Sequence, residues 1–423
     1  MHIHLHIHCH TILLVALSLE LLAPLPAMSQ QLTPEASLRA RVDERLEQLR
    51  SDLIAFRRDL HRHPELSGKE ERTARVVAER LRRLDLDVLT DVGGHGVVAL
   101  LRGGKPGPVV AFRADIDAVS SEFADPVDFP STVDGVRHIC GHDIHTTVGI
   151  ALAEGFASIR NELAGSVLLI FQPAEETALG ARAMIQAGAL RNPQPKAIFA
   201  LHTAPFEVGQ IGSMPGVMLA GRDHLSLTLT GQTDLSGLAQ MVRNVIHGVN
   251  SVDSDAASVS GDFIMAQVYR SEAGPEKNSW VLQALITTTS ARMRAKAKNE
   301  IGTALDSLEV QGISYALDYK EREISGVTND CVLEQASHAP VRSVVSDSGL
   351  VILDEIPPLF SEDFGFFQDE VPGVMYYLGV SNSARGWIGM PHTPQYVADE
   401  ESIFVGARVM FAVMFDYLVT HPQ

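Results

Sequence analysis

The sequence predicts an α/β protein of two domains, in which a larger sheet domain covered by helices is interrupted by a smaller α+β domain. Two observations predict this architecture. Helical patterns alternate with short apolar strands at both ends of the chain, as expected for a sheet covered on both faces. The middle of the chain is more polar, and 423 residues are enough for two domains.

The N-terminus does not have the pattern of a folded domain. The stretch "TILLVALSLELLAPLPAMS" is apolar, contains Pro24 and Pro26, and ends in small residues. We therefore predict a signal peptide over residues 1–29 and a periplasmic or secreted product. The leading "MHIHLHIHCH" lacks the usual Lys or Arg, so the alternative is translation from Met28 and a cytoplasmic product. No membrane anchor is expected, because the apolar run is short and prolines end it.

Residues 30–221 are predicted to form the first part of the larger domain. Apolar residues recur at helical spacing up to about Arg83, with charged residues between them. Short apolar runs bounded by glycine and proline then alternate with helical patterns. The expected strands cover residues 96–103, 107–115, 165–173 and 197–202, and the expected helices cover residues 146–163 and 180–190.

Residues 222–328 are predicted to form the inserted domain. "DHLSLTLTG" alternates like a half-exposed strand, polar helical patterns then continue to about Val310, and "ISYALDYK" is typical of an edge strand. The α/β character returns over residues 329–423, through "GVMYYLGV" to a terminal helix. Both ends of the chain are therefore expected to build the larger domain.

Charge and cysteine content narrow the classes of function. The formal net charge of −18 argues against a nucleic-acid partner, since phosphate binding needs clustered Lys and Arg. Outside the predicted signal the cysteines are Cys140 and Cys331, which are too few and too far apart in sequence for a disulfide framework. Cys140 therefore needs another explanation.

Side chains that can bind metal lie at four places, three of them next to predicted strands or helices. Loops after the carboxyl ends of strands in an α/β sheet converge on one crevice, so such side chains can meet. Thiolate, imidazole and carboxylate together suit Zn²⁺, Mn²⁺, Co²⁺ or similar ions. Each place alone has an ordinary structural explanation, but the four together predict a metal site. The residues are Cys140 and His142 before a predicted helix, Glu175 and Glu176 after an apolar strand, His202 at the end of another strand, and His392 near the C-terminus.

Several longer stretches resemble one enzyme family. The chain contains, in the family's order, "FRRDLHRHPELSGKE", "AFRADIDAV", "CGHDIHTT", "FQPAEE", "ARAMIQAGAL", "ALHTAPFEVGQIG", "SEDFGFF" and "MPHTP". They resemble the metal-dependent amidohydrolases that include hippurate hydrolase, N-acyl amino acid deacylases and plant hydrolases of indole-acetyl amino acids. The resemblance implies a catalytic domain with an inserted lid or dimerisation domain. It also implies cleavage of the amide bond of N-acyl amino acids or related small amides, by an enzyme acting on carbon–nitrogen bonds other than peptide bonds.

The resemblance also implies a role for each site residue. It implies two divalent ions, with Mn²⁺ or Zn²⁺ favoured over Co²⁺ or Ni²⁺, and a metal-activated water as the nucleophile. His138 and His145 are expected to be supporting residues. The implied metal ligands are Cys140 as a bridging thiolate, His142, Glu176, His202 and His392; the implied general base is Glu175, and Asp115 and Asp117 would orient ligands by hydrogen bonds.

The inserted domain departs from the family's pattern. Relatives follow the strand that matches "LSLTLTG" with Gly-Lys-Gly-Gly-His-Ala-Ala-x-Pro-His, whose histidine helps to stabilise the oxyanion. Here the chain continues as "GQTDLSGLAQMVRNVIHGVNSV", with an apparent deletion. His247 lies in a predicted helix, does not match the motif, and is expected to be a surface residue. Loss of one oxyanion donor typically costs about 100- to 1,000-fold in turnover, so modest activity is expected.

Three interpretations of the function follow from this departure. The first is an active amidohydrolase with an altered lid. The second is a metal-binding homologue with little or no turnover, and the complete ligand set favours the first over it. The third is a dipeptidase or carboxypeptidase of the same superfamily, but its members carry aspartate where this chain carries Cys140. A homodimer through the inserted domain is compatible with the resemblance, although the motif there is altered.

Overall fold

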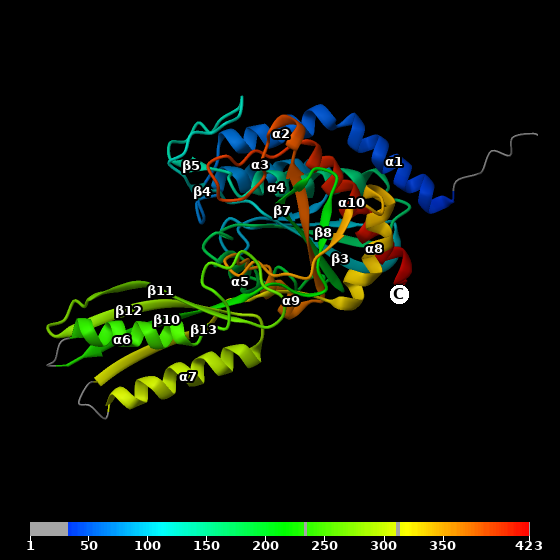
Figure 1. Cartoon of the computed structure of the whole chain (residues 1–423). Coiled ribbons are helices and arrows are strands. Elements are labelled where there is room, and N and C mark those ends of the chain that lie inside the picture. Colours follow the sequence, from blue (N-terminus) through cyan, green and yellow to red (C-terminus); the bar gives the residue numbers. More distant parts are fainter. Residues whose placement is uncertain (1–32, 232–234, 310–313, 423) are drawn as a thin grey trace, which may run out of the picture.

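The computed structural model describes residues 33–231, 235–309 and 314–422, and the predicted signal peptide lies outside them. Its centre is an eight-stranded sheet built by both ends of the chain (Figure 1). The strand order is β1-β2-β6-β3-β7-β16-β8-β15. These strands are β1 (Asp87–Leu89), β2 (Val97–Arg102), β3 (Lys105–Asp115), β6 (Ala164–Gln172), β7 (Ala197–Glu207), β8 (Ile211–Ser213), β15 (Leu350–Ile352) and β16 (Gly373–Ser381).

The central strands β6, β3, β7 and β16 run parallel to one another. Both faces of these strands are buried, which explains why their sequences are nearly continuous apolar runs. The sequence predicted a strand that ends at His202. This prediction is wrong, because the strand, β7, continues to Glu207. Pairing with β3 stops at Ala200, whereas pairing with β16 continues to the end of β7. His202 therefore lies just beyond the carboxyl end of the β3–β7 pairing.

Helices cover both faces of this sheet, so the predicted fold class is confirmed. One face packs a large apolar core against six helices, and the other packs a second core against two short helices. On the first face lie α1 (Pro34–Gln48), α2 (Arg50–Arg62), α3 (Glu71–Arg83), α4 (His142–Ser158), α8 (Cys331–Val345) and α10 (Glu401–Thr420), and on the second lie α5 (Gly180–Gln186) and α9 (Gly365–Glu370).

Helix α10 is the one helix of the described residues that is long and apolar enough to cross a membrane. Its length is 20 residues, and 67% of its most apolar window is buried inside the protein. It packs against α4 and α8 beneath the sheet. Its apolar composition is therefore accounted for by its place in the core.

The segment between the two halves forms a separate sheet with the strand order β11-β12-β10-β13. Two helices cover one face of this sheet, and their apolar side chains share a core with alternate residues of the strands. No helix of the described residues covers the other face of the sheet (Figure 1). The elements are β10 (Gly221–Thr230), α6 (Leu235–Gly248), β11 (Ile264–Ala273), β12 (Ser279–Thr288), α7 (Ala291–Glu309) and β13 (Ser314–Ile324).

The expectation that helical patterns continue to Val310 is wrong, because the hairpin of β11 and β12 lies within that range. In β12 the residues at every second position, Leu282, Ala284 and Ile286, are buried against the helices. The residues of the other face of β12 are mixed, with Gln283 and Thr287 polar and Leu285 apolar, so the strand does not show a regular alternation of apolar and polar residues. The expected edge strand is confirmed, because β13 lies at one edge of the sheet.

Two short strands join the inserted segment to the larger sheet domain. Strand β9 (Gly216–Leu219) precedes the segment and pairs with β14 (Val327–Asn329), which follows it. The two crossing chains approach closely at Gly326, where an added Cβ would lie 2.6 Å from the backbone nitrogen of Gly221. Glycine at this position therefore permits the close crossing. A further small pair, β4 (Val119–Ser120) with β5 (Val136–Arg137), lies next to the site described below.

Candidate metal centre

A tight turn at Gly141 separates two of the predicted ligands. Gly141 has a φ of 88°, and an added Cβ would lie 2.2 Å from the Tyr396 hydroxyl and 2.6 Å from the Thr203 side chain. A side chain does not fit in this position. Sequence analysis placed His142 before a helix, but α4 begins at His142 itself, so the ring projects from its first turn. The Thr203 hydroxyl donates to the Cys140 carbonyl oxygen at 2.6 Å and fixes the turn.

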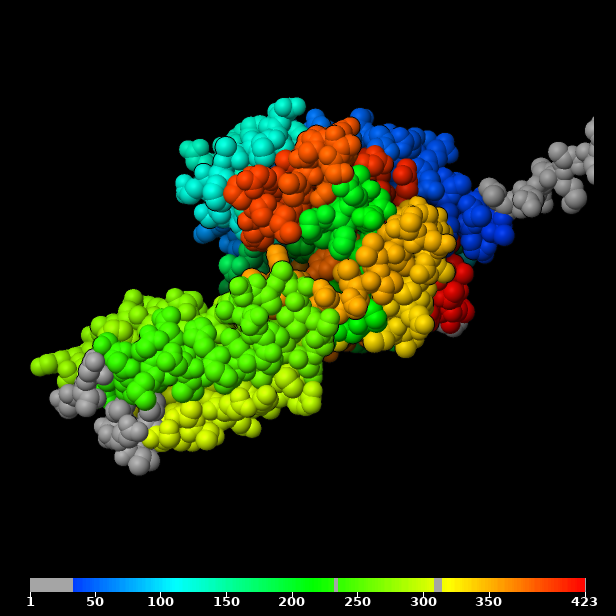
Figure 2. All heavy atoms as spheres, viewed as in Figure 1, coloured from blue at the N-terminus to red at the C-terminus, as the bar shows by residue number. Residues whose placement is uncertain are grey.

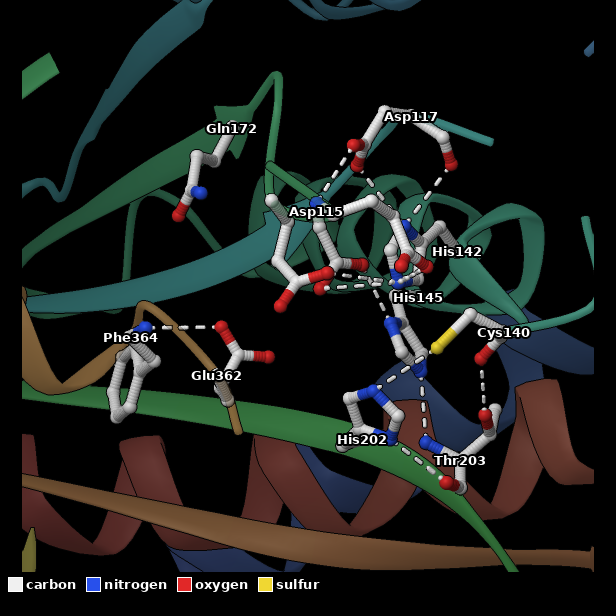
Figure 3. A network of polar contacts seen from close by, with 12 residues as sticks. Asp115, Asp117, Cys140, His142, His145, Gln172, His202, Thr203, Glu362 and Phe364 are labelled. Carbon is white, nitrogen blue, oxygen red and sulfur yellow. Dashed lines mark hydrogen bonds and ion pairs between the residues drawn. The ribbon is translucent and has the colours of Figure 1, made fainter. Parts of the chain in front are cut away.

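One ring nitrogen of His142 is hydrogen-bonded, and the other has no hydrogen-bond partner among the described residues. Its Nδ1 lies 3.1 Å from Oδ1 of Asp117 and 3.0 Å from the Asp117 carbonyl oxygen. Its Nε2 is buried, has no hydrogen-bond partner among the described residues, and lies 3.7 Å from Oε1 of Glu176. Asp117 also accepts the backbone N–H of Glu176 at 3.0 Å. One carboxylate thus orients two of the predicted ligands, and Figure 3 shows it beside one of them, His142.

His202 is fixed in a similar way within β7. Its Nδ1 lies 2.8 Å from the Thr203 carbonyl oxygen, and its Nε2 lies 3.4 Å from Sγ of Cys140. Asp115, at the end of β3, hydrogen-bonds to His145 at 2.6 Å and not to a predicted ligand. The other ring nitrogen of His145 accepts the Thr203 N–H at 2.8 Å. Asp115 therefore positions the backbone next to His202 through His145 (Figure 3), and its own carboxylate also lies 3.8 Å from Nε2 of His142.

Glu176 and His392 come from two loops in which nearby residues adopt the left-handed backbone conformation. The φ of Ala174 is 53° and that of His392 is 58°, which is unusual outside glycine. Glu70 supports the first loop by accepting the Ala174 N–H at 2.8 Å. The N–H of His392 donates to the Ile139 carbonyl oxygen at 2.9 Å. These loops place Oε1 of Glu176 3.4 Å from Nε2 of His392.

The predicted ligands form two groups that share the Cys140 thiol. One group is Cys140, His142 and His202, the other is Cys140, Glu176 and His392, and in each the donor atoms lie within 4.8 Å of one another. Thiolate, imidazole and carboxylate are the donors that Zn²⁺ and related divalent ions prefer. The buried Nε2 of His142 and Oε1 of Glu176 lack hydrogen-bond partners among the described residues, which is rare for buried polar atoms. The residues therefore fit two divalent cations, and each group of donors would hold one of them.

Buried carboxylates give this site an excess of negative charge. Burial disfavours a charged ring at His142, but the carboxylates of Asp115 and Asp117 outweigh it and raise the pKa of His142 to about 10. Burial, followed by the charge of Glu176, raises the pKa of the Cys140 thiol well above its usual range. Divalent cations would neutralise this charge and favour the thiolate and the neutral ring, so the electrostatics also fit the donor set.

Glu175 lies beside the ligand groups and lines the cavity in front of them. It is 7% exposed, and its Oε2 lies 3.7 Å from Nε2 of His142. Burial raises the pKa of Glu175 well above its usual range, and the nearby carboxylates of Glu362 and Glu176 raise it further. A carboxylate with a raised pKa accepts a proton more readily than an ordinary one.

Sequence analysis gave no role to Arg113, Glu362 or Asp363, which meet at the back of the site. The Arg113 guanidinium is fully buried and lies 2.7 Å from Asp115, 2.8 Å from Glu362 and 3.1 Å from Asp363. The stretches "AFRADIDAV" and "SEDFGFF" that contain these residues were recognised in the sequence. The inserted segment separates these two stretches in the sequence. Neither stretch by itself therefore indicates that Arg113 pairs with Glu362 and Asp363.

Two cavities open at the ligand groups. The larger, about 570 Å³, lies between the sheet domain and the inserted segment, and Figure 2 shows a hollow where these two parts meet. The smaller, about 330 Å³, shares five lining residues with the larger one, namely His202, Phe360, Ser361, Glu362 and Pro391. Most of its remaining wall is apolar and includes Pro205, Phe206, Leu219, Leu353, Tyr377 and Met390.

The inserted segment contributes no histidine to the larger cavity among the described residues. Its contribution consists of Arg222, Leu285, Glu323 and Ile324. His247 is half-buried on α6, which packs on the other face of the sheet. Residues 232–234, at the start of the altered stretch, lie outside the described residues.

Comparisons with known proteins agree with these observations. Residues 111–416 match the family described as peptidase family M20/M25/M40. The N-acetylcysteine deacetylase of Bacillus subtilis is 32% identical over 84% of this chain and 94% of that protein. Thermostable carboxypeptidase 2 of Saccharolobus solfataricus is 30% identical over 86% of this chain and 95% of that protein. The crystal structure of a Bacillus subtilis protein, described as a dinuclear metal-binding peptidase, has a TM-score of 0.72 and 27% identity, covering 88% of this chain and 99% of that one.

Proposed function

The chain belongs to peptidase family M20/M25/M40 and is a metal-dependent amidohydrolase, and we propose that it hydrolyses the amide bond of N-acyl amino acids with Glu175 as the general base. The observation that carries this proposal is the sharing of Cys140 by two groups of metal-binding side chains. Cys140, His142 and His202 would hold one cation, and Cys140, Glu176 and His392 the other. We propose Zn²⁺ or Mn²⁺ as the occupants, since both suit these donors.

Bound cations would supply Lewis acidity, polarising the amide carbonyl and lowering the pKa of a water molecule at the site. The protein's own residues supply the proton transfers. Glu175 faces the cavity next to the ligands and is not needed in either ligand group that contains Cys140. It would take the proton of the attacking water and return it to the nitrogen of the leaving amine. The raised pKa of Glu175 favours the first of these transfers.

Arg113 would support this chemistry without contacting the substrate. Its guanidinium holds both Glu362 and Asp115 at the back of the site. These ion pairs keep the carboxylates in fixed positions, so the charge around Glu175 is also fixed. His145, with both ring nitrogens in hydrogen bonds, would position the backbone beside His202.

The two cavities support a substrate with a polar and an apolar end. The larger cavity contains the ligand groups and charged residues from the inserted segment, and the smaller one has a mainly apolar wall. We propose that the smaller cavity accepts the acyl group, because burial of its apolar surface would contribute binding free energy. The amide bond would then lie near His202 and Glu362, which line both cavities.

A carboxypeptidase or dipeptidase activity is the second proposal, and the similarity to the carboxypeptidase of Saccharolobus solfataricus favours it. The decisive assay supplies Zn²⁺ or Mn²⁺ to the mature protein and measures kcat/KM on a matched panel of N-acyl amino acids and dipeptides. The first proposal predicts higher kcat/KM for the N-acyl amino acids. Preference for dipeptides would favour the second, and no hydrolysis of either class would favour a metal-binding protein with little turnover.

The role of Glu175 is tested against its neighbour Glu176, which serves as the matched control. Glu175→Gln should keep the metal and lose hydrolysis, because the amide has nearly the same size but cannot accept the proton of water. Glu176→Gln should lose metal, because its carboxylate belongs to one ligand group. Elemental analysis and activity are measured on both variants. If Glu175→Gln kept both its metal and its hydrolytic activity, the general base would have to be another residue.

We also propose that the protein is exported, on the strength of the apolar N-terminal stretch that ends in small residues. Expression of the full chain and N-terminal sequencing of the recovered protein test this. A mature start near Gln30 outside the cytoplasm is expected, and a cytoplasmic product beginning at Met28 would contradict it.

A further inference from the structure

Arg222 is the one lysine or arginine that lines the larger cavity among the described residues. It is the second residue of β10, and strand alternation places it on the helix-free face of the inserted sheet. Leu225, Leu227 and Leu229 point to the opposite face, where they pack against α6 and α7. The guanidinium therefore faces the cavity that contains the metal-binding residues.

Arg222 makes few of the contacts that a guanidinium normally makes. One terminal nitrogen donates to the Leu359 carbonyl oxygen at 3.1 Å. Its Nε is buried and has no hydrogen-bond partner among the described residues. Arg222 also forms no ion pair with any of these residues. Burial lowers the pKa of Arg222, because the charge is removed from water without full compensation.

The two acidic residues nearest in sequence or space do not satisfy this charge. Asp223 points to the other face, where its carboxylate binds Arg294 at 3.0 Å and the Tyr319 hydroxyl at 3.0 Å. Glu323 lines the same cavity and opposes the lowering of the Arg222 pKa, but it is largely exposed and makes no ion pair with Arg222. A partly buried guanidinium without a carboxylate partner is therefore available to a ligand.

The opposite wall of the cavity carries carboxylates, including Glu175, Glu176 and Glu362. An anionic group of a ligand would be repelled by these side chains and attracted by Arg222. Guanidinium groups bind carboxylates well, because two parallel N–H donors match the two oxygens. The charge distribution thus distinguishes the two ends of the cavity and defines where an anionic end of the substrate would lie.

We propose that Arg222 binds the carboxylate of the amino-acid part of the substrate and makes the enzyme selective for acyl amino acids over uncharged amides. This inference rests on the proposed function and adds the residue that recognises the substrate's charged end. The acyl group would extend in the other direction, into the apolar cavity. Sequence reasoning did not single out Arg222, because it lies in no metal-binding or catalytic motif.

The test compares each N-acyl amino acid with the same compound in which a carboxamide replaces the carboxylate. Arg222→Ala should lower kcat/KM about 10- to 100-fold for the acid, mainly through KM, and change it little for the carboxamide. Arg222→Lys should recover part of the loss. Arg270→Ala, which removes an exposed arginine on the same sheet, is the control and should leave both values unchanged.

Two results would overturn the inference. An equal loss of kcat on the acid and the carboxamide would mean that Arg222 acts on the reacting carbonyl and not on the carboxylate. Loss of discrimination in Arg292→Ala, with none in Arg222→Ala, would assign recognition to an exposed arginine elsewhere in the inserted segment. Equilibrium binding of acid and carboxamide to the Glu175→Gln protein, with and without Arg222→Ala, gives a readout independent of turnover. If the unmodified enzyme cleaves neither compound, the proposed function fails, while this binding measurement still decides the role of Arg222.

Discussion

Replacement of Cys140 is expected to remove both cations, whereas replacement of His392 is expected to remove one. Cys140 belongs to both ligand groups and His392 to a single group. Cys140→Ala leaves each group with two protein donors, but His392→Ala leaves the group of Cys140, His142 and His202 complete. The number of retained cations should therefore fall from two to about zero in the first variant and to about one in the second.

The size of the effect can be bounded from the contacts. Loss of a residue that only supports a ligand typically weakens metal binding about 10- to 100-fold, so loss of a direct ligand should weaken it at least about 100-fold. That corresponds to roughly 2.7 kcal/mol or more per affected cation. For Cys140→Ala the loss applies to both cations, because the thiol is common to the two groups.

The assay loads each variant with Zn²⁺, dialyses it against metal-free buffer and measures the metal by elemental analysis. His421→Ala, at an exposed position beyond α10, is the control and should retain the full amount. Circular dichroism checks that each variant is folded, and Cys140→Ser provides a second variant of nearly unchanged size. Full retention of metal by a folded Cys140→Ala protein would refute the bridging assignment. Loss of both cations in His392→Ala would refute the division into two groups.

Three further predictions concern residues around the ligands. Asp117→Asn should weaken metal binding about 10- to 100-fold, because it disturbs the carboxylate that orients His142; a competition titration with a chelating dye measures this. Arg113→Met should lower the free energy of unfolding by about 3–5 kcal/mol, because it leaves buried carboxylates without their partner, and an unchanged urea midpoint would contradict this. Burial opposes a charge on His61, but contacts with carboxylates that include Asp143 raise its pKa. At pH values above about 6.5, the folded protein then binds more protons at His61 than the unfolded chain does. The free energy of unfolding should therefore fall as the pH rises through the raised pKa of His61. In thermal unfolding experiments, His61→Gln should reduce this dependence of stability on pH.

The larger sheet could be predicted from sequence because its central strands are buried on both faces. Strands such as β3 and β6 are short apolar runs bounded by glycine or proline, and this pattern does not depend on distant contacts. The hairpin of β11 and β12 was missed for the opposite reason. One face of that hairpin carries no described helix and holds both polar and apolar residues, such as Gln283 and Leu285, so the sequence lacks the regular alternation that identifies a strand. The end of β7 was also missed, because its last residues are held by β16 from the other end of the chain.

The sequence identified the residues that the structure brings together around Cys140, and the family resemblance gave adjacent Glu175 and Glu176 different roles. Both carboxylates lie 3.7 Å from Nε2 of His142, so in the structure it is the contact with His392 that distinguishes Glu176 from its neighbour. The ion pair of Arg113 with Glu362 joins residues from the two ends of the chain. Arg222 stands out because it has no carboxylate partner among the described residues, and a missing ion pair leaves no trace in a sequence.

The late position of β16 in the chain has a consequence for biosynthesis. Strand β16 lies between β7 and β8 in the finished sheet, yet it is translated after the whole inserted segment. A nascent chain that has not reached β16 would present the apolar edge of β7, and such an edge is prone to pair with other chains. The inserted sheet, by contrast, is continuous in sequence and can fold as soon as it leaves the ribosome. Premature termination between Asn329 and Gly373 is therefore expected to yield an aggregating product in which the inserted segment alone is folded.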